Sequence, residues 1–182
     1  MTVTRLLFIF VLAVTSSGVL ADSPDPSRQL FGGLPLDLAI KQVRGNGTLT
    51  FATFEDPNCP YCEQMARDIA DLSDVTIYTF IYPVLSDASE EIAEAIWCAP
   101  NRSKAWKAWM TSRSVPAKSA CNTEAIAKIV ALGKEMKIHS VPTIFLANGE
   151  RISGARSRME LEMAISSPKV RIFQASLRTK PD

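Results

Sequence analysis

The stretch CPYC at residues 59–62 constrains this chain more than any other feature of its sequence. Residues 48–54, which precede it, are rich in Thr and Phe and predict a mostly buried strand. Residues 60–72 carry apolar side chains at helical spacing, and Pro60 suits the first helical position, where a missing N–H costs nothing. We therefore expect Cys59 to lie where a strand meets the N-terminus of a helix.

A metal site is the first alternative role for the CPYC pair. Structural zinc needs four ligands, but the two other cysteines, Cys98 and Cys121, are far apart and the sequence has one histidine. A c-type haem site needs histidine at position 63, which is Glu63. A structural disulfide across two residues is an uncommon cross-link. The pattern favours a redox-active dithiol that needs neither a metal nor a cofactor.

The expected position of Cys59 predicts its chemistry. Unpaired N–H groups and the helix dipole stabilise negative charge at a helix N-terminus, so Cys59 should ionise readily and attack as a thiolate. Pro60 and Tyr61 are uncharged, so we expect the helix end to supply most of the pKa shift. Cys62 lies one turn further in, where it can resolve a mixed disulfide. Stabilising the Cys59 thiolate also makes the disulfide more oxidising.

The remaining sequence predicts an α/β fold, in which helices pack on a mixed sheet. The expected elements are strands 36–44 and 48–54, helix 60–72, strand 75–82, a helix opened by a capping box at Asp87 and Glu90, a helix near residues 104–110, helix 123–137, strands 143–147 and 151–153, and a last helix capped by Ser157 and Glu160. Residues 87–137 form a helical insert before the last strand pair.

The two ends of the chain are expected to lie outside the domain. Met1–Ala21 has a positive start, a short apolar run and a small-residue end, which is typical of a cleaved secretory signal. The run LLFIFVLAV is too short for a spanning helix, which needs roughly 20 residues, although an uncleaved anchor is the alternative. Residues 22–35 predict a linker, residues 36–167 the domain, and residues 168–182 a solvated basic tail.

The charge balance argues against nucleic acid as a partner. Removing the signal takes away one basic residue, Arg5, so that 20 Lys and Arg become 19, against 19 Asp and Glu. A chain with no basic surplus lacks the charge needed to neutralise phosphates.

A second motif, SVPT at residues 140–143, precedes a predicted strand. A proline there is an ordinary edge feature, or it is a cis proline whose neighbouring backbone pairs with a bound peptide. The segments FEDPNCPYCEQM, EIAEAIWCAPNRSKAW and ALGKEMKIHSVPTIFLANGERISGA resemble the catalytic domain of the DsbC/DsbG family of periplasmic disulfide isomerases, over about residues 36–165. The resemblance implies a thioredoxin-like fold with a helical insert.

The resemblance also implies roles for particular residues. Cys59 would be the attacking cysteine, Cys62 the resolving one and Pro142 the cis proline, with Val141 and Tyr61 on the substrate-binding surface.

The other two cysteines would form a disulfide within the insert. Such a Cys98–Cys121 bridge would contribute roughly 3 kcal/mol. Two free buried thiols are the alternative.

Two departures from the family bear on function. The family carries a dimerisation domain before its catalytic domain, and the short stretch between Ala21 and Leu36 leaves no room for it, so we expect a monomer. Val141 stands where the family usually has Thr, and Val at this position resembles the oxidase DsbA instead. Both departures favour simple dithiol exchange.

The sequence therefore predicts a periplasmic thiol–disulfide oxidoreductase. Its partners would be unfolded or misoxidised exported proteins and a membrane redox partner. A glutaredoxin-like reductase is one alternative. The other is a substrate-binding chaperone or an accessory protein of secretion or conjugation with secondary redox activity.

Glu55 and Asp56 are candidate proton acceptors for Cys62, although a solvated loop pair is the favoured interpretation.

Overall fold

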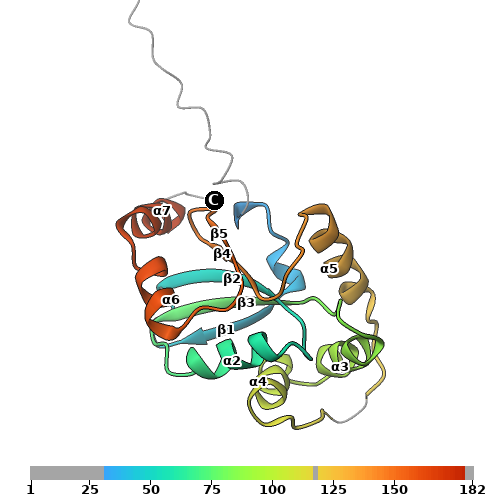
Figure 1. The fold of residues 1–182 in the computed structure, drawn as a ribbon. Helices are drawn as coiled ribbons and strands as arrows, with labels where there is room; N and C mark the ends of the chain where they lie inside the picture. Colours follow the sequence, from blue (N-terminus) through green and yellow to red (C-terminus); the bar gives the residue numbers. More distant parts are fainter. Residues whose placement is uncertain (1–30, 117–118, 179–182) are drawn as a thin grey trace, which may run out of the picture.

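The computed structural model describes residues 31–116 and 119–178, in which a five-stranded mixed sheet is flanked by helices (Figure 1). The strands are β1 (Ile40–Arg44), β2 (Leu49–Glu55), β3 (Val75–Ile81), β4 (Thr143–Leu146) and β5 (Arg151–Ser153). The helices are the 3-10 helix η1 (Leu36–Leu38) and the α-helices α2 (Pro60–Asp68), α3 (Asp87–Trp97), α4 (Arg102–Ser112), α5 (Glu124–Glu135), α6 (Arg158–Ile165) and α7 (Pro168–Arg178). The predicted α/β class and helical insert are confirmed.

The sheet has the order β1-β3-β2-β4-β5. Strands β2 and β3 are parallel and pair along their whole length, whereas β1 pairs with β3, β4 with β2 and β5 with β4 in antiparallel fashion. The turn at Gly45–Gly47 therefore joins two strands that do not pair, because β3 lies between them. Strand β2 is the middle strand, and CPYC follows its C-terminal end.

Two hydrophobic clusters cover the opposite faces of the sheet. Phe54 belongs to a cluster that includes Ile96 of α3, Trp106 of α4 and Ile129 of α5. Phe51 belongs to the other cluster, with residues of α2, α6 and α7. Because side chains alternate along a strand, Phe51 and Phe54 point to opposite faces, and β2 is covered on both. The buried middle strand gives the start of α2 a rigid base.

The N-terminal boundary differs from the prediction. The predicted linker includes Phe31 and Leu34, which are buried in the core. Residues Leu36–Leu38 form a 3-10 turn instead of the start of a strand, because the N–H of Leu38 bonds the carbonyl of Pro35. The predicted signal and the rest of the linker lie outside the described residues.

Two helix ends also differ from the prediction. Helix α3 is capped by Ser86, whose hydroxyl accepts the N–H of Ser89, so the predicted capping box at Asp87 and Glu90 is wrong by one residue. Helix α2 ends at Asp68 because Arg44 of β1 donates to the carbonyls that follow it. The capping box of Ser157 and Glu160 is confirmed.

The predicted solvated tail is wrong over residues 168–178, which form α7. Val170 is fully buried, and the amide of Gln174 donates to the carbonyl of Thr50 at 3.2 Å. Lys169 and Arg171 remain exposed, so the basic residues lie on the solvent side of an amphipathic helix. The charge pattern concealed the helical spacing of Val170 and Gln174.

No helix within residues 31–116 and 119–178 has both the length and the apolar character that crossing a bilayer requires.

Candidate active site

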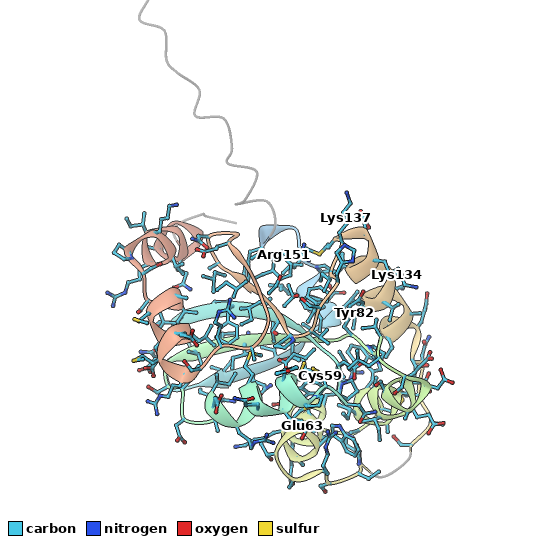
Figure 2. The ribbon with its side chains drawn as sticks, viewed as in Figure 1. Cys59, Glu63, Tyr82, Lys134, Lys137 and Arg151 are labelled. Carbon is cyan, nitrogen blue, oxygen red and sulfur yellow. A yellow bond between two sulfur atoms is a disulfide. The ribbon has the colours of Figure 1, made fainter. Side chains whose placement is uncertain are left out.

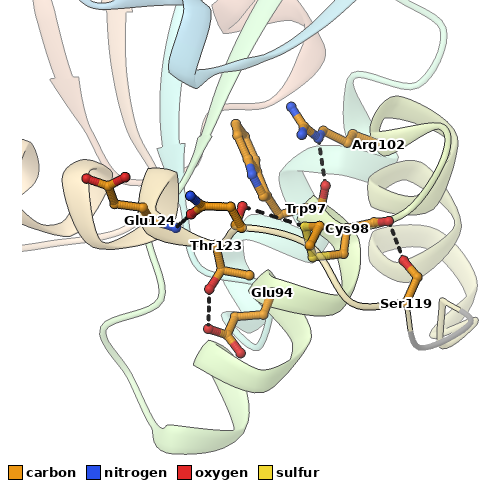
Figure 3. The surroundings of a disulfide bond; sticks show 9 residues. Glu94, Trp97, Cys98, Arg102, Ser119, Thr123 and Glu124 are labelled. Carbon is orange, nitrogen blue, oxygen red and sulfur yellow. Dashed lines mark hydrogen bonds between the residues drawn. A yellow bond between two sulfur atoms is a disulfide. The ribbon is translucent and has the colours of Figure 1, made fainter.

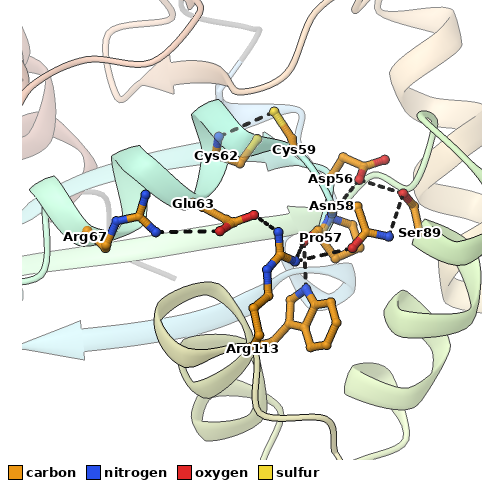
Figure 4. A network of polar contacts seen from close by, with 10 residues as sticks. Asp56, Pro57, Asn58, Cys59, Cys62, Glu63, Arg67, Ser89 and Arg113 are labelled. Atoms are coloured by element: carbon orange, nitrogen blue, oxygen red, sulfur yellow. Dashed lines mark hydrogen bonds and ion pairs between the residues drawn. The ribbon is translucent and has the colours of Figure 1, made fainter.

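The two cysteines of CPYC lie at the first turn of α2 and are both buried and unpaired. Cys59 is the N-cap residue, and Pro60 takes the first helical position, as predicted. The Cys62 N–H donates to the Cys59 sulfur at 3.4 Å (Figure 4). Cys59 therefore uses its sulfur where other N-cap residues use an oxygen, which directs backbone donors at the sulfur.

The surroundings of Cys59 favour its thiolate. Its pKa is lowered to about 6, mainly because the Cys62 thiol donates a hydrogen bond to it, with further donation from the backbone N–H groups of Cys62 and Tyr61. Burial and the charge of Asp56 oppose this shift. The expectation that the helix end supplies most of the shift is therefore wrong, because the neighbouring thiol contributes most.

Cys62 is the opposite case. Burial raises its pKa, and so do its hydrogen bond to Cys59 and the charges of Glu55 and Cys59. One sulfur is therefore ionised near neutral pH while the other keeps its proton, which is the asymmetry that attack and resolution require.

The Val141–Pro142 peptide bond is cis. The Cys59 thiol lies 3.5 Å from the carbonyl of Val141, so two segments far apart in the sequence meet at the sulfur. Pro142 is buried and Val141 half-buried, whereas Tyr61 is 66% exposed. These three residues border Cys59 from two sides.

The loop before the cis proline is held by one side chain from β5 and by one from the residue that follows β3. Arg151 of β5 donates to the carbonyls of Met136 and Lys137 at 2.8 and 2.7 Å, beside the end of α5 (Figure 2). The Tyr82 hydroxyl donates to the carbonyl of Ile138 at 3.4 Å. These anchors fix the position of the Val141 carbonyl relative to Cys59.

Glu55 and Asp56 are both buried, so the favoured interpretation as a solvated pair is wrong. Asp56 accepts four hydrogen bonds, from the N–H groups of Asn58, Val84 and Leu85 and from the Ser89 hydroxyl, at 2.8–2.9 Å. These bonds hold the approach to CPYC, which is residues 56–58, against the loop that follows β3. Both carboxylate oxygens of Asp56 already accept hydrogen bonds, so Asp56 serves the structure of this loop.

Glu55, by contrast, has a free oxygen. Its Oε2 has no hydrogen-bond partner among the described residues, and burial raises the pKa of its carboxyl to about 8, with the charge of Cys59 adding to the rise. Glu55 and Thr79, whose hydroxyl is also unpaired, line a cavity of about 30 Å³ that extends to Arg44 and Lys107. A cavity of this size, with these two unpaired polar atoms on its wall, is large enough for a water molecule.

Comparisons with known proteins agree with this geometry. The sequence model of the thioredoxin-like domain family matches residues 36–167. The chain belongs to the thioredoxin-like domain family. The thioredoxin-like domain described here has the mixed sheet, the dithiol at a helix start and the cis proline opposite it.

Several relatives of this thioredoxin-like domain are disulfide interchange proteins by name. It is 45% identical over 132 residues to a probable thiol:disulfide interchange protein DsbC of Bordetella parapertussis, covering 72% of this chain and 47% of that protein. It is 32% identical over 114 residues to the thiol:disulfide interchange protein DsbC of Escherichia coli K12, covering 60% and 47%. The chain thus spans about half the length of the curated relatives it matches.

A crystal structure of a disulfide interchange protein from Neisseria gonorrhoeae superposes with a TM-score of 0.71 at 36% identity. The match covers 76% of this chain and 99% of that one.

The second cysteine pair of this thioredoxin-like domain forms a disulfide within the insert, with an S–S distance of 1.98 Å (Figure 3). Cys98 ends α3, and its carbonyl accepts a hydrogen bond from the Ser119 hydroxyl. Thr123, before α5, bonds Glu94 of α3 at 2.9 Å. The bridge therefore fastens α5 to α3.

Sequence patterns missed two residues beside the dithiol, Trp109 and Arg113. The indole N–H of Trp109 donates to the Pro57 carbonyl at 2.7 Å. Arg113, at the end of α4, donates to the same carbonyl at 2.8 Å. No motif marks either residue, because the contact depends on how the insert folds back onto the CPYC approach.

Within the described ranges, no group of three or more His, Cys, Asp or Glu side chains is arranged to hold a metal ion.

Proposed function

We propose that the protein is a periplasmic thiol–disulfide oxidoreductase, which exchanges its Cys59–Cys62 pair with cysteines of exported proteins. The observation that supports this most is the opposed acidity of the two sulfurs, together with the Val141 carbonyl, just before the cis proline, 3.5 Å from the Cys59 sulfur. A lowered thiol pKa at a helix start is typical of reactive cysteines.

In the oxidising direction, a substrate thiolate attacks the Cys59 sulfur of the disulfide. The Cys59–Cys62 bond breaks, a substrate–Cys59 bond forms, and Cys62 leaves as a thiolate. A second substrate thiolate then attacks the substrate sulfur and releases Cys59 as a thiolate. Two substrate thiols are oxidised, and the protein takes up two electrons. A membrane redox partner with its own dithiol or disulfide returns the pair to its starting state.

Glu55 is the group that we assign to the proton of Cys62. With a pKa of about 8, its carboxyl is mostly protonated at neutral pH and can give a proton to the leaving Cys62 thiolate. In the reverse direction the carboxylate takes that proton, so Cys62 can attack the mixed disulfide. The cavity that Glu55 shares with Thr79 offers the proton a route to solvent. We do not assign Asp56 as a proton acceptor for Cys62, since its oxygens already accept four hydrogen bonds.

The substrate-binding surface would be formed by Tyr61, Val141 and Pro142. A substrate segment that lies against the cis-proline loop brings its cysteine to the Cys59 sulfur, because that loop contacts the sulfur directly. We further propose that the protein acts as a monomer on unfolded or misoxidised chains. The signal-like start of the sequence supports export.

Trapping tests this proposal. A Cys62→Ser variant, expressed with its own N-terminus, should accumulate mixed disulfides with exported proteins, because nothing resolves the bond to Cys59. The matched Cys59→Ser variant should accumulate none. Non-reducing gels of the periplasmic fraction measure both. Equal trapping by the two variants, or a Cys59 pKa equal to that of a free thiol, would contradict the proposed function.

A further inference from the structure

Arg113 has an unusual backbone for its residue type. It is the C-cap of α4 with a φ of 52°, in the left-handed region, where glycine is the usual choice because it has no side chain to clash. Its side chain is 40% exposed, yet it turns back onto the approach to CPYC. A strained position held by a charged residue calls for a functional explanation.

The guanidinium of Arg113 makes a set of contacts that converge on this approach (Figure 4). It donates to the Pro57 carbonyl at 2.8 Å and to the Asn58 side chain at 3.3 Å, and it forms an ion pair with Glu63. It lies 4.8 Å from the ring of Trp109, which donates to the same Pro57 carbonyl at 2.7 Å.

The residues that Arg113 contacts lie directly beside the two reactive cysteines in the sequence. Pro57 and Asn58 directly precede Cys59, and Glu63 directly follows Cys62. Asp56 holds the same approach from inside the domain, through the Asn58 N–H. The segment that enters α2 is therefore fixed from the core by one carboxylate and from the insert by Arg113 and Trp109.

The ion pair has an electrostatic consequence. Glu63 is in the first turn of α2, where its negative charge opposes a thiolate on Cys59. Arg113 neutralises that charge at close range, and Arg67 at 3.6 Å assists from the same helix. Glu63 is only 16% exposed, so water screens this charge less than it would at an open surface.

We propose that Arg113 is a positioning residue for the dithiol, which fixes the entry to α2 and cancels the charge of Glu63, so that the Cys59 thiolate and hence the reduced form are stabilised. This inference rests on the proposed function, because it assumes that Cys59 is the reacting group. It also assigns the helical insert a part in setting how oxidising the disulfide is.

The test uses Arg113→Met, which keeps an unbranched apolar stem and removes the charge and the hydrogen-bond donors of the side chain. The pH dependence of thiolate absorbance gives the acidity of Cys59, and the glutathione exchange constant gives the oxidising strength of the disulfide. We expect both the acid dissociation constant and the oxidising equilibrium constant to fall by about threefold to tenfold. Circular dichroism and the Tm show whether the fold is kept.

Three further variants separate the contributions. Arg113→Lys keeps the charge without the forked donors, so its shift should be smaller than that of Arg113→Met. Trp109→Phe removes one donor to Pro57 and leaves Glu63 paired, so a small shift in the same direction is expected. Adding Glu63→Gln to Arg113→Met should recover part of the loss. The remaining titratable groups around Cys59, which are Cys62, Glu55 and Asp56, are unaltered in all four proteins.

The outcome distinguishes this inference from the proposed function. A folded Arg113→Met protein with the acidity and exchange constant of the unaltered chain would overturn the role of Arg113, even if its Tm fell. Should Arg113→Met not fold, unchanged values in Arg113→Lys and Trp109→Phe would overturn it equally. An unaltered chain whose Cys59 ionises like a free thiol would instead contradict the proposed function.

Discussion

The two cysteine pairs of this domain share a side-chain chemistry and differ in almost every contact. Cys59 and Cys62 are buried at a helix start with a buried carboxyl nearby, and Cys59 contacts the Val141 carbonyl just before the cis proline. Cys98 and Cys121 join two helices of the insert, and Cys121 is exposed. The sulfur of Cys59 accepts hydrogen bonds that stabilise its anion, whereas Cys98 and Cys121 are joined in a disulfide. Local donors therefore decide which pair can exchange.

The largest expected difference between the two pairs is their ease of reduction. Lowering the Cys59 pKa from 9.0 to about 6 stabilises the reduced form of CPYC by up to roughly a thousandfold at high pH. In a glutathione titration followed by alkylation and mass spectrometry, Cys59–Cys62 should be reduced well before Cys98–Cys121. Reduction of both pairs at the same glutathione concentration would contradict this difference in their ease of reduction.

The next largest effect concerns stability. Replacing Cys98 and Cys121 together by Ala opens a loop with a sequence separation of 23 residues and should lower the free energy of unfolding by about 3 kcal/mol. Denaturant unfolding measures this change. The Cys59 pKa should be unaffected, since the bridge does not touch the dithiol. An altered thiolate titration in this variant would show that the two pairs are coupled.

Protonation of Glu55 should affect both the stability of the fold and the reactivity of the dithiol. Its pKa is raised from 4.5 to about 8, so the folded state holds a proton that the unfolded chain releases, and stability should fall as pH rises between these values. Glu55→Gln should raise the free energy of unfolding at pH 8 by roughly 2 kcal/mol. It should also slow resolution by Cys62 about tenfold or more, as stopped-flow kinetics would show. The control is Glu150→Gln, which removes an exposed carboxyl in the turn between β4 and β5.

The smallest expected effect is at Val141. A hydroxyl introduced by Val141→Thr next to the Cys59 sulfur should change the glutathione exchange constant by about twofold to fivefold. The Tm should hardly change because the two side chains are nearly the same size. Replacing Val84, an exposed apolar residue on the loop bonded to Asp56, by Thr serves as the control and should leave the constant unchanged.

Much of the fold was predictable because its signals are local. The strand before CPYC, the helix after it and the Ser157–Glu160 capping box depend on residues close together in the sequence. The failures involve distant partners. Arg44 ends α2 from another strand, and Gln174 reaches Thr50, which turns an apparent tail into a helix.

The site shows the same division. Cys59 and Cys62 follow from the CPYC motif. The SVPT motif left an ordinary edge proline open, and only the family resemblance implied the cis proline that the structure has, close to Cys59. The burial of Glu55 and Asp56 could not be foreseen, because an acidic pair next to a loop is solvated in most proteins. The contribution of the Cys62 thiol to the acidity of Cys59 likewise needs the geometry of the turn, since the spacing alone permits several orientations.

The attachment of α7 has a practical consequence. Gln174 binds Thr50 near the beginning of β2, whereas CPYC follows the other end of that strand, roughly 17 Å away for five residues of extended chain. A fluorescent label or surface tether on the exposed Ile172 would thus be held by a rigid helix at the end of the strand remote from the reactive sulfur. Such a derivative could report on substrate capture without obstructing it.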